Sequence, residues 1–172
     1  MSEHLASVGE GPYHPVRNDI ADRSHMLRLL IVCIGNPLRS DDGIAWRVGQ
    51  ELSSEKMPDG VQVIATHQLT PEISELASQA EKILFVDAAD DGPPGNIKCE
   101  RIGPGATPLR HSHKLSPEEV LAFCQHLYSR SPAAHLLTIA GESFEPGVSL
   151  TPAVSVAADE LRKRIRDFIA GH

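Results

Sequence analysis

Acidic and histidine side chains follow separate apolar runs of the chain, and together they could bind a metal ion. Asp41 and Asp42 follow the first of these runs, Asp87 ends a later one, and His111 and His113 lie in a loop rich in glycine and proline. Two carboxylates and one imidazole form an oxygen, oxygen, nitrogen set. This set suits zinc, nickel or another divalent ion with open coordination positions.

Each of these residues also has a purely structural interpretation. Asp41 and Asp42 precede a helical pattern, and helix N-termini favour Asp as a cap and as a charge on the helix dipole. Asp87 could cap a loop, since Asp is common in turns. However, a carboxylate at the tip of a buried strand needs a hydrogen-bond donor or a cation. A shared site is favoured because open parallel sheets bind ligands beyond the carboxyl ends of their strands.

The elements that must position these side chains alternate between strand and helix. We expect strands at Leu27–Ile34, 61–65, 82–88, 96–102 and 135–140, and helices at 44–52, 71–80, from Pro117 to 128, and 154–168. The first run is apolar almost throughout, as in a central parallel strand that is buried on both faces. The alternation predicts an α/β protein, a three-layer α/β/α fold with a mainly parallel, doubly wound sheet.

The domain organisation follows from length and composition. Residues 1–26 combine Ser, Gly, Pro and His with scattered charges and show no apolar period. We therefore expect a disordered leader, or an extension foreign to the native protein, and we expect residues 27–172 to form a single α/β domain. A chain of 172 residues with 41% hydrophobic residues is long enough to bury a core of its own.

Charge and cysteine content exclude several classes of partner. Sixteen Lys and Arg against 23 Asp and Glu give a net charge of −7, so we expect no nucleic-acid partner. No apolar run approaches the ~20 residues that span a bilayer, so we expect no membrane insertion. Cys33, Cys99 and Cys124 form neither a CxxC pair nor an even disulfide set, which favours a cytoplasmic protein.

Missing motifs argue against two common enzyme classes. GxGxxG is absent, and Asp41 and Asp42 would repel a pyrophosphate at that helix start, which disfavours NAD and ATP. There is no GxSxG motif, and none of the cysteines has an activating base nearby in the sequence. A serine or cysteine hydrolase is therefore disfavoured as well.

Five stretches are informative in their order and combination: 34–44 (IGNPLRSDDGI), 68–72 (QLTPE), 85–88 (FVDA), 113–117 (HKLSP) and 138–147 (TIAGESFEPG), the last followed by Leu150 and Thr151. Together they resemble the nickel-iron hydrogenase maturation endopeptidase family, from about Leu27 to the last helix. Members of that family remove a short C-terminal extension from the hydrogenase large-subunit precursor after nickel insertion.

The resemblance implies specific roles for Asp42, Asp87 and His113. The family's metal-contacting trio is an acidic residue that opens the first helix, an Asp that ends a strand and a His before the next helix. These three residues are therefore the expected catalytic and nickel-contacting set, with His111 as the fallback ligand. The implied partner is the large-subunit precursor. The nickel is presented by that substrate, and no tightly bound cofactor is expected.

The sequence departs from the family at one segment. Many members carry an Asp-Gly-Gly-Thr-like segment after the second strand, whereas residues 65–70 here read ATHQLT. The Asp thought to assist cleavage in those members corresponds to Ala65. We therefore expect different substrate contacts in this chain, with His67 and Gln68 as the candidates.

Two other functions remain open. A non-enzymatic nickel-binding hydrogenase assembly factor would use the same trio, and only a mass change at the partner's C-terminus separates it from an endopeptidase. A peptidyl-tRNA hydrolase-like enzyme is the second alternative, because Gly35, Asn36 and Pro37 resemble that family's turn after the first strand. An acidic chain without a basic groove disfavours it.

Overall fold

A computed structural model describes residues 26–105 and 115–171, which fold into one five-stranded sheet with helices on both faces. The elements in chain order are β1 (Leu27–Ile34), the 3-10 helix η2 (Ser40–Gly43), α1 (Ile44–Ser53), β2 (Val61–Thr66), α2 (Ile73–Ser78), β3 (Ala80–Ala89), β4 (Ile97–Ile102), α3 (Pro117–Tyr128), β5 (Ala133–Ala140) and α4 (Pro152–Ala170). The predicted three-layer α/β/α fold is confirmed.

The strand order is β2-β1-β3-β5-β4. The strands β2, β1, β3 and β5 are parallel, and β4 pairs antiparallel with β5. From β1 the chain moves outward to β2 and then returns to the other side of β1 to form β3. The sheet is therefore doubly wound. The direction in which successive strands are added to it reverses between β1 and β3, and such sheets bind ligands at this reversal point.

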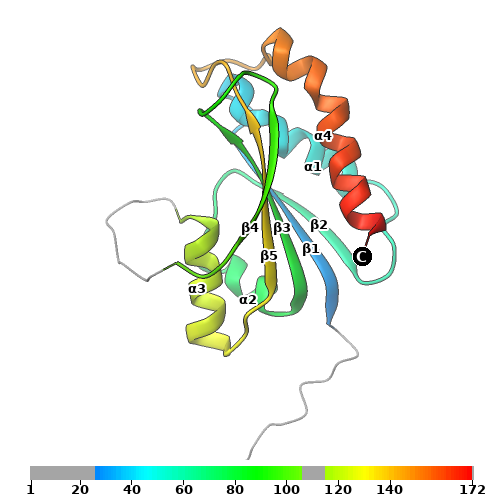
Figure 1. The fold of residues 1–172 in the computed structure, drawn as a ribbon, viewed down its shortest axis with the longest axis vertical. Coiled ribbons are helices and arrows are strands. Elements are labelled where there is room, and N and C mark those ends of the chain that lie inside the picture. The colour runs from blue at the N-terminus through cyan, green and yellow to red at the C-terminus, as the bar shows by residue number, and fades with distance from the viewer. Residues whose placement is uncertain (1–25, 106–114, 172) are drawn as a thin grey trace, which may run out of the picture.

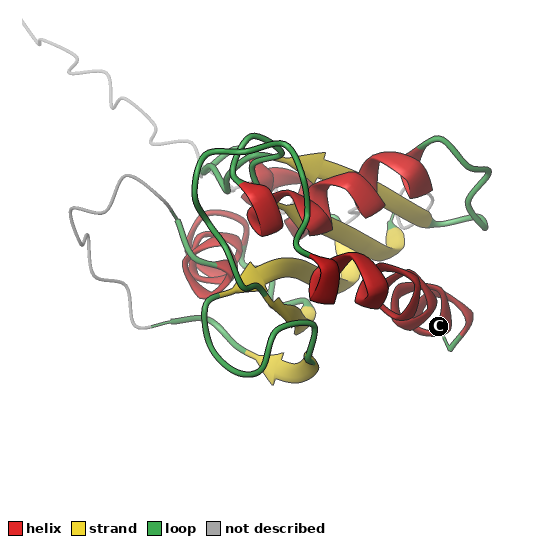
Figure 2. Ribbon diagram, turned by 90° about the horizontal axis from the view of Figure 1, so that it is seen from above, coloured by secondary structure: helices red, strands yellow, loops and turns green. Residues whose placement is uncertain are grey.

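Two apolar cores lie on opposite faces of the sheet. Leu29, Ile31 and Cys33 pack in the core with residues of α1 and α4, whereas Leu30 and Val32 pack with residues of α2 and α3. Alternate residues of a strand point to opposite faces, so an apolar run without interruption is what an internal strand requires. Figure 1 shows α1 and α4 together on one side and α2 and α3 on the other. Figure 2 shows the helices and loops around the strands from above.

Every expected strand and helix is present, with ends within two residues of those expected, and the difference of most consequence lies between α2 and β3. Ala80 was expected at the end of a helix but begins β3, where it pairs with Leu27. The helix α2 ends early at Ser78, and the carbonyl of Gln79 accepts a hydrogen bond of 2.9 Å from the backbone N–H of Leu27. Sheet pairing therefore overrides the helical spacing.

At its other end β3 runs two residues beyond Asp87, because β3 keeps its pairing with β5 up to Ala89. The expected leader falls on residues 1–25 and Met26, and residues 1–25 lie outside the described ranges, so that expectation stays a prediction. In the part of the chain that the structure describes, no helix is both long enough and apolar enough to cross a membrane.

Candidate functional site

Asp42 and Asp87 line one pocket at the carboxyl ends of the parallel strands. The pocket has a volume of about 240 Å³, and its walls come from the end of β1, the segment after β2 and the start of α3: Ile34, Gly35, Asp42, His67, Gln68, Leu69, Asp87, Leu115, Ser116 and Pro117. The structure thus brings together the two carboxylates expected from the sequence. Their location matches the reversal point between β1 and β3.

The expected histidine ligand falls on a part of the chain for which no structure is given. His111 and His113 both belong to residues 106–114, outside the described ranges, so their roles stay predictions. Leu115, the next described residue, lines the pocket. Among the described residues, no group of three His, Cys, Asp or Glu side chains is placed to hold a metal ion. A three-ligand set at Asp42 and Asp87 would therefore need a further residue.

The backbone of the β1–η2 turn holds Asp42 in place. The Asp42 Oδ2 atom accepts a hydrogen bond of 3.0 Å from the backbone N–H of Asn36. Gly35 has a φ of 155°, and a Cβ atom at this position would lie 1.9 Å from the carbonyl oxygen of Asp42. Only glycine fits this close approach. The glycine of the turn is therefore part of what positions the carboxylate.

Asp87 is half-buried and lies two residues before the end of β3, where it is paired with Thr138 of β5. Its Oδ1 atom accepts a hydrogen bond of 2.9 Å from the backbone N–H of Ala88. This contact with the next residue of the chain helps to orient the carboxylate. The sequence predicted that Asp87 ends the strand and needs a hydrogen-bond donor or a cation; the strand continues to Ala89, and the Ala88 N–H is one such donor.

Asp41 has a role that the sequence analysis missed. It is fully buried, and its carboxylate accepts hydrogen bonds from the backbone N–H groups of Glu142 (2.9 Å), Ser143 (3.1 Å) and Thr151 (2.7 Å) and from the Thr151 hydroxyl (2.8 Å). Burial alone would raise the pKa of Asp41, but the donors of Thr151, Glu142 and Ser143 outweigh it and hold this pKa below its ordinary value of 3.8.

These contacts correct the helix-cap interpretation of the two neighbouring aspartates. No side chain caps η2 or α1 by a hydrogen bond. Asp41 instead binds residues 141–151, the loop between β5 and α4, and Asp42 binds the turn after β1. The two acidic residues therefore face different partners, and only Asp42 reaches the pocket. The donors to Asp41 lie in the 138–147 stretch and at Thr151, so these residues are the part of the sequence that could have indicated its structural role.

Further contacts fasten the same loop to the segment before η2. The Arg39 guanidinium donates two hydrogen bonds of 3.1 Å to the carbonyl of Phe144. The Ser40 hydroxyl donates to the carbonyl of Glu145 at 3.0 Å, and its N–H donates to the carbonyl of Gly147 at 2.8 Å. Ser40 has a φ of 47°, a left-handed conformation that these bonds stabilise. We call this set of contacts, together with those of Asp41, the loop clasp.

His67 and Gln68 both line the pocket, as expected for candidate substrate contacts. The His67 ring lies 5.7 Å from the ring of Trp46 in α1, with the two planes tilted by 53°. The preceding residue, Thr66, is fixed by a hydrogen bond of 3.0 Å from the N–H of Gly35 to its carbonyl oxygen. The segment with the unusual ATHQLT sequence is thus joined directly to the turn that carries Asp42.

The cysteines do not provide a nucleophile for this pocket. Burial raises the pKa of the Cys33 thiol to about 12 and that of Cys124 to about 11, so both are protonated at neutral pH. Cys99 lies exposed on β4, and burial raises its pKa as well. None of the three lines the pocket. The structure supports the sequence argument against a cysteine hydrolase.

Thiol labelling at pH 8 tests this description. In the native protein we expect a disulfide reagent to modify Cys99 alone, because Cys33 and Cys124 are buried and protonated. All three thiols should react after unfolding in denaturant. Cys99→Ser should remove the native reaction. Rapid native labelling of a Cys99→Ser variant would contradict the burial of the other two thiols.

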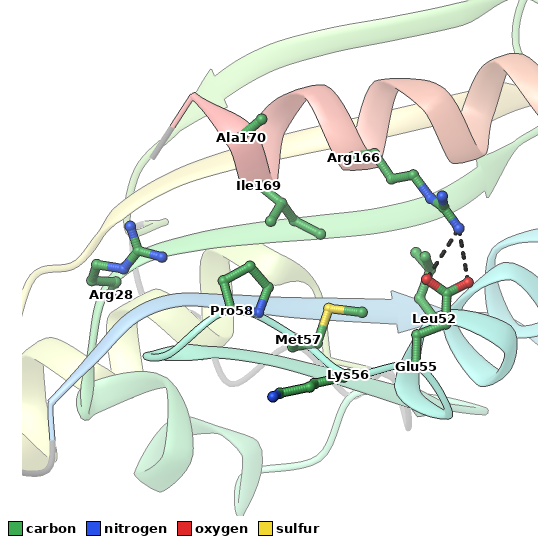
Figure 3. A pocket seen from close by; sticks show the side chains of 9 residues that line it. All are labelled: Arg28, Leu52, Glu55, Lys56, Met57, Pro58, Arg166, Ile169 and Ala170. Carbon is green, nitrogen blue, oxygen red and sulfur yellow. Dashed lines mark hydrogen bonds and ion pairs between the residues drawn. The ribbon is translucent and has the colours of Figure 1, made fainter.

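A larger hollow lies at the opposite end of β1. Its volume is about 410 Å³, and it is lined by Arg28, Leu52, Glu55, Lys56, Met57, Pro58, Arg166, Ile169 and Ala170. In Figure 3 the Arg166 guanidinium faces the Glu55 carboxylate, to which it donates hydrogen bonds of 2.8 and 3.1 Å. Its one carboxylate is neutralised by an ion pair, and no histidine lines it. The smaller pocket is therefore the better candidate for hydrolytic chemistry.

Comparison with known proteins identifies the class of structure. No protein-family model and no curated protein matches the chain. Several solved structures share its fold, and three of them are hydrogenase maturation proteases. HybD from E. coli, a hydrogenase maturating endopeptidase, superposes with a TM-score of 0.69 at 21% identity, covering 84% of this chain and 93% of that chain.

Two archaeal structures give the same result. The NiFe hydrogenase maturation protease HycI from Thermococcus kodakarensis KOD1 has a TM-score of 0.68 at 18% identity, covering 86% of this chain and 95% of that chain. HybD from the same species has a TM-score of 0.58 at 20% identity, covering 83% and 99%. At these identities the likeness establishes the fold, which this chain shares with the maturation proteases along nearly their whole length.

Proposed function

We propose that this protein is an endopeptidase that removes the C-terminal extension of a nickel-loaded hydrogenase large-subunit precursor. The observation that carries the proposal is the meeting of Asp42 and Asp87 in one pocket at the reversal point of the sheet. Two half-buried carboxylates that face a shared cavity suit a divalent cation. The shared fold with solved maturation proteases and the ordered motifs support the same assignment.

In this proposal the metal arrives with the substrate. Asp42 and Asp87, together with His113, contact the nickel ion of the precursor and so align the peptide bond that is cut. The nickel, or a polar group beside it, polarises the scissile carbonyl or activates a water molecule. No covalent intermediate is required, which agrees with the protonated state of Cys33 and Cys124. Three cysteines without disulfides fit a reducing cytoplasm.

Intact-mass measurement tests the activity. The purified protein is incubated with nickel-loaded precursor and, separately, with nickel-free precursor. We expect the loaded precursor to lose the mass of its C-terminal extension and the released peptide to appear, while the nickel-free precursor keeps its mass. Equal cleavage of both forms would contradict recognition through nickel. Stable binding of the loaded precursor without any mass change would instead indicate a non-enzymatic assembly factor.

A further inference from the structure

Among the described residues that line the pocket, His67 alone carries an imidazole, which can both accept and donate a proton through its ring nitrogens. We propose that His67 is a further catalytic residue, which carries the proton during hydrolysis of the peptide bond. The inference rests on the proposed endopeptidase function and extends it to a residue outside the nickel-contacting trio.

The backbone places His67 at a fixed point of the pocket wall. It directly follows the last residue of β2, and β2 pairs with β1 up to Thr66 opposite Ile34. The Thr66 carbonyl accepts the N–H of Gly35, and the Thr66 hydroxyl donates a hydrogen bond of 2.8 Å to the carbonyl of Gln68. These two bonds set the position of the residue between them. The ring of Trp46 then restricts the imidazole from the α1 side.

The other groups that face the pocket are less suited to this task. Within ranges 26–105 and 115–171, the titratable side chains that line it with His67 are Asp42 from η2 and Asp87 from β3, and Trp46 on the α1 side is uncharged. In the proposed function both carboxylates contact nickel, and a carboxylate bound to a cation is a weak proton acceptor. Gln68 has an amide, which does not exchange a proton near neutral pH.

His67 also does not complete a metal site with the two carboxylates. In the described part of the chain no three His, Cys, Asp or Glu side chains are placed around a common ion. The imidazole of His67 is thus in the pocket but outside a shared coordination sphere. It is exposed, so both water and a peptide can reach it. A general base needs access to water, and the position of His67 in the wall of the pocket provides it.

The proposed step consumes one water molecule. A ring nitrogen of His67 accepts a proton from water while the water oxygen bonds to the scissile carbonyl carbon. The resulting imidazolium then donates a proton to the amide nitrogen as the carbon–nitrogen bond breaks. The products are a carboxylic acid, which loses its proton to solvent, and an amine. His67 returns to its neutral form, and no atom is oxidised or reduced.

The test uses single-turnover cleavage of nickel-loaded precursor by the full chain. We expect His67→Gln to slow cleavage by about 10²- to 10⁴-fold, because Gln keeps hydrogen-bonding ability but cannot carry the proton. Binding of the loaded precursor should stay unchanged. The pH profile of His67→Gln should differ from that of the unaltered protein, and free imidazole should restore part of the activity of His67→Ala. The control His126→Gln, on the exposed side of α3, should cleave at the normal rate.

The outcomes separate this inference from the function on which it rests. If the unaltered protein does not cleave the loaded precursor, the endopeptidase proposal itself fails. If it cleaves and a folded His67→Gln variant matches its rate and pH profile, the role of His67 is wrong and the endopeptidase proposal stands. If His67→Gln loses precursor binding in proportion to its rate, His67 is a docking residue and the proton-transfer role is also wrong.

Discussion

Replacing Asp87 with Asn should abolish cleavage of the nickel-loaded precursor while the protein stays folded. The amide keeps an oxygen that can accept the N–H of Ala88, but it lacks the negative charge that binds a divalent cation. Loss of an outer partner of a metal ligand already costs about 10- to 100-fold, so loss of a direct contact should cost at least about 100-fold. Asp42→Asn and His113→Ala should behave alike. Intact mass of the precursor measures the effect.

Controls for these variants are available in the same region. Asp90 is exposed in the turn just after β3, so Asp90→Asn should cleave at the normal rate. Thermal melts must accompany every assay. Asp90→Asn changes an exposed residue, so it should shift the free energy of unfolding by no more than about 0.5 kcal/mol. A well-folded variant that combines Asp87→Asn with His113→Ala and still trims the precursor normally would rule out the nickel-directed mechanism.

Asp41→Ala should lower the free energy of unfolding by about 3 kcal/mol. The change leaves the N–H groups of Glu142, Ser143 and Thr151 without their acceptor, and unmade buried hydrogen bonds of this kind are costly. Urea denaturation measures the difference. Asp91→Ala is the matched control, because Asp91 is exposed and forms an ion pair with the exposed Lys98. An Asp41→Ala variant as stable as this control would contradict the structural role of Asp41.

The same carboxylate should make stability depend on pH. Its pKa in the folded protein lies below the ordinary value of 3.8, so the folded state binds this proton less readily than the unfolded state does. The stabilisation is therefore fully present above 3.8 and is lost as the pH falls from there through the folded pKa. In acid, the unaltered protein should lose stability more steeply than Asp41→Asn. Parallel curves for the two proteins would show that Asp41 titrates normally.

The sequence was a good guide to the fold because its signals are local. The run Leu27–Ile34, apolar except for Arg28, indicated an internal strand, and the alternation of strand and helix indicated a doubly wound sheet. Asp42 and Asp87 could be placed together because Asp42 follows β1 and Asp87 lies near the end of β3, and the ends of these parallel strands share one edge. No contact between the two residues had to be known in advance.

What the sequence did not reveal depends on distant partners. Asp41 and Asp42 are chemically identical neighbours at a helix start, and nothing local shows that the first binds Thr151 and the second lines the pocket. Ala80 fits a helical spacing, yet pairing with Leu27 places it in a strand. His67 was a candidate only because its segment departs from a family pattern. Its contact with Trp46 arises from packing between α1 and the end of β2.

The loop clasp can form only late in the synthesis of the chain. The hydrogen bonds of Asp41 join residues that are 101 to 110 positions apart in the chain. Closing so long a segment is entropically costly, and contacts of this kind form late in folding. On the ribosome, Asp41 lacks its full set of donors until Thr151 has emerged. A nascent chain therefore carries Asp41 and Asp42 without the support of the loop clasp, and the pocket reaches its final form only after residues 141–151 have been made.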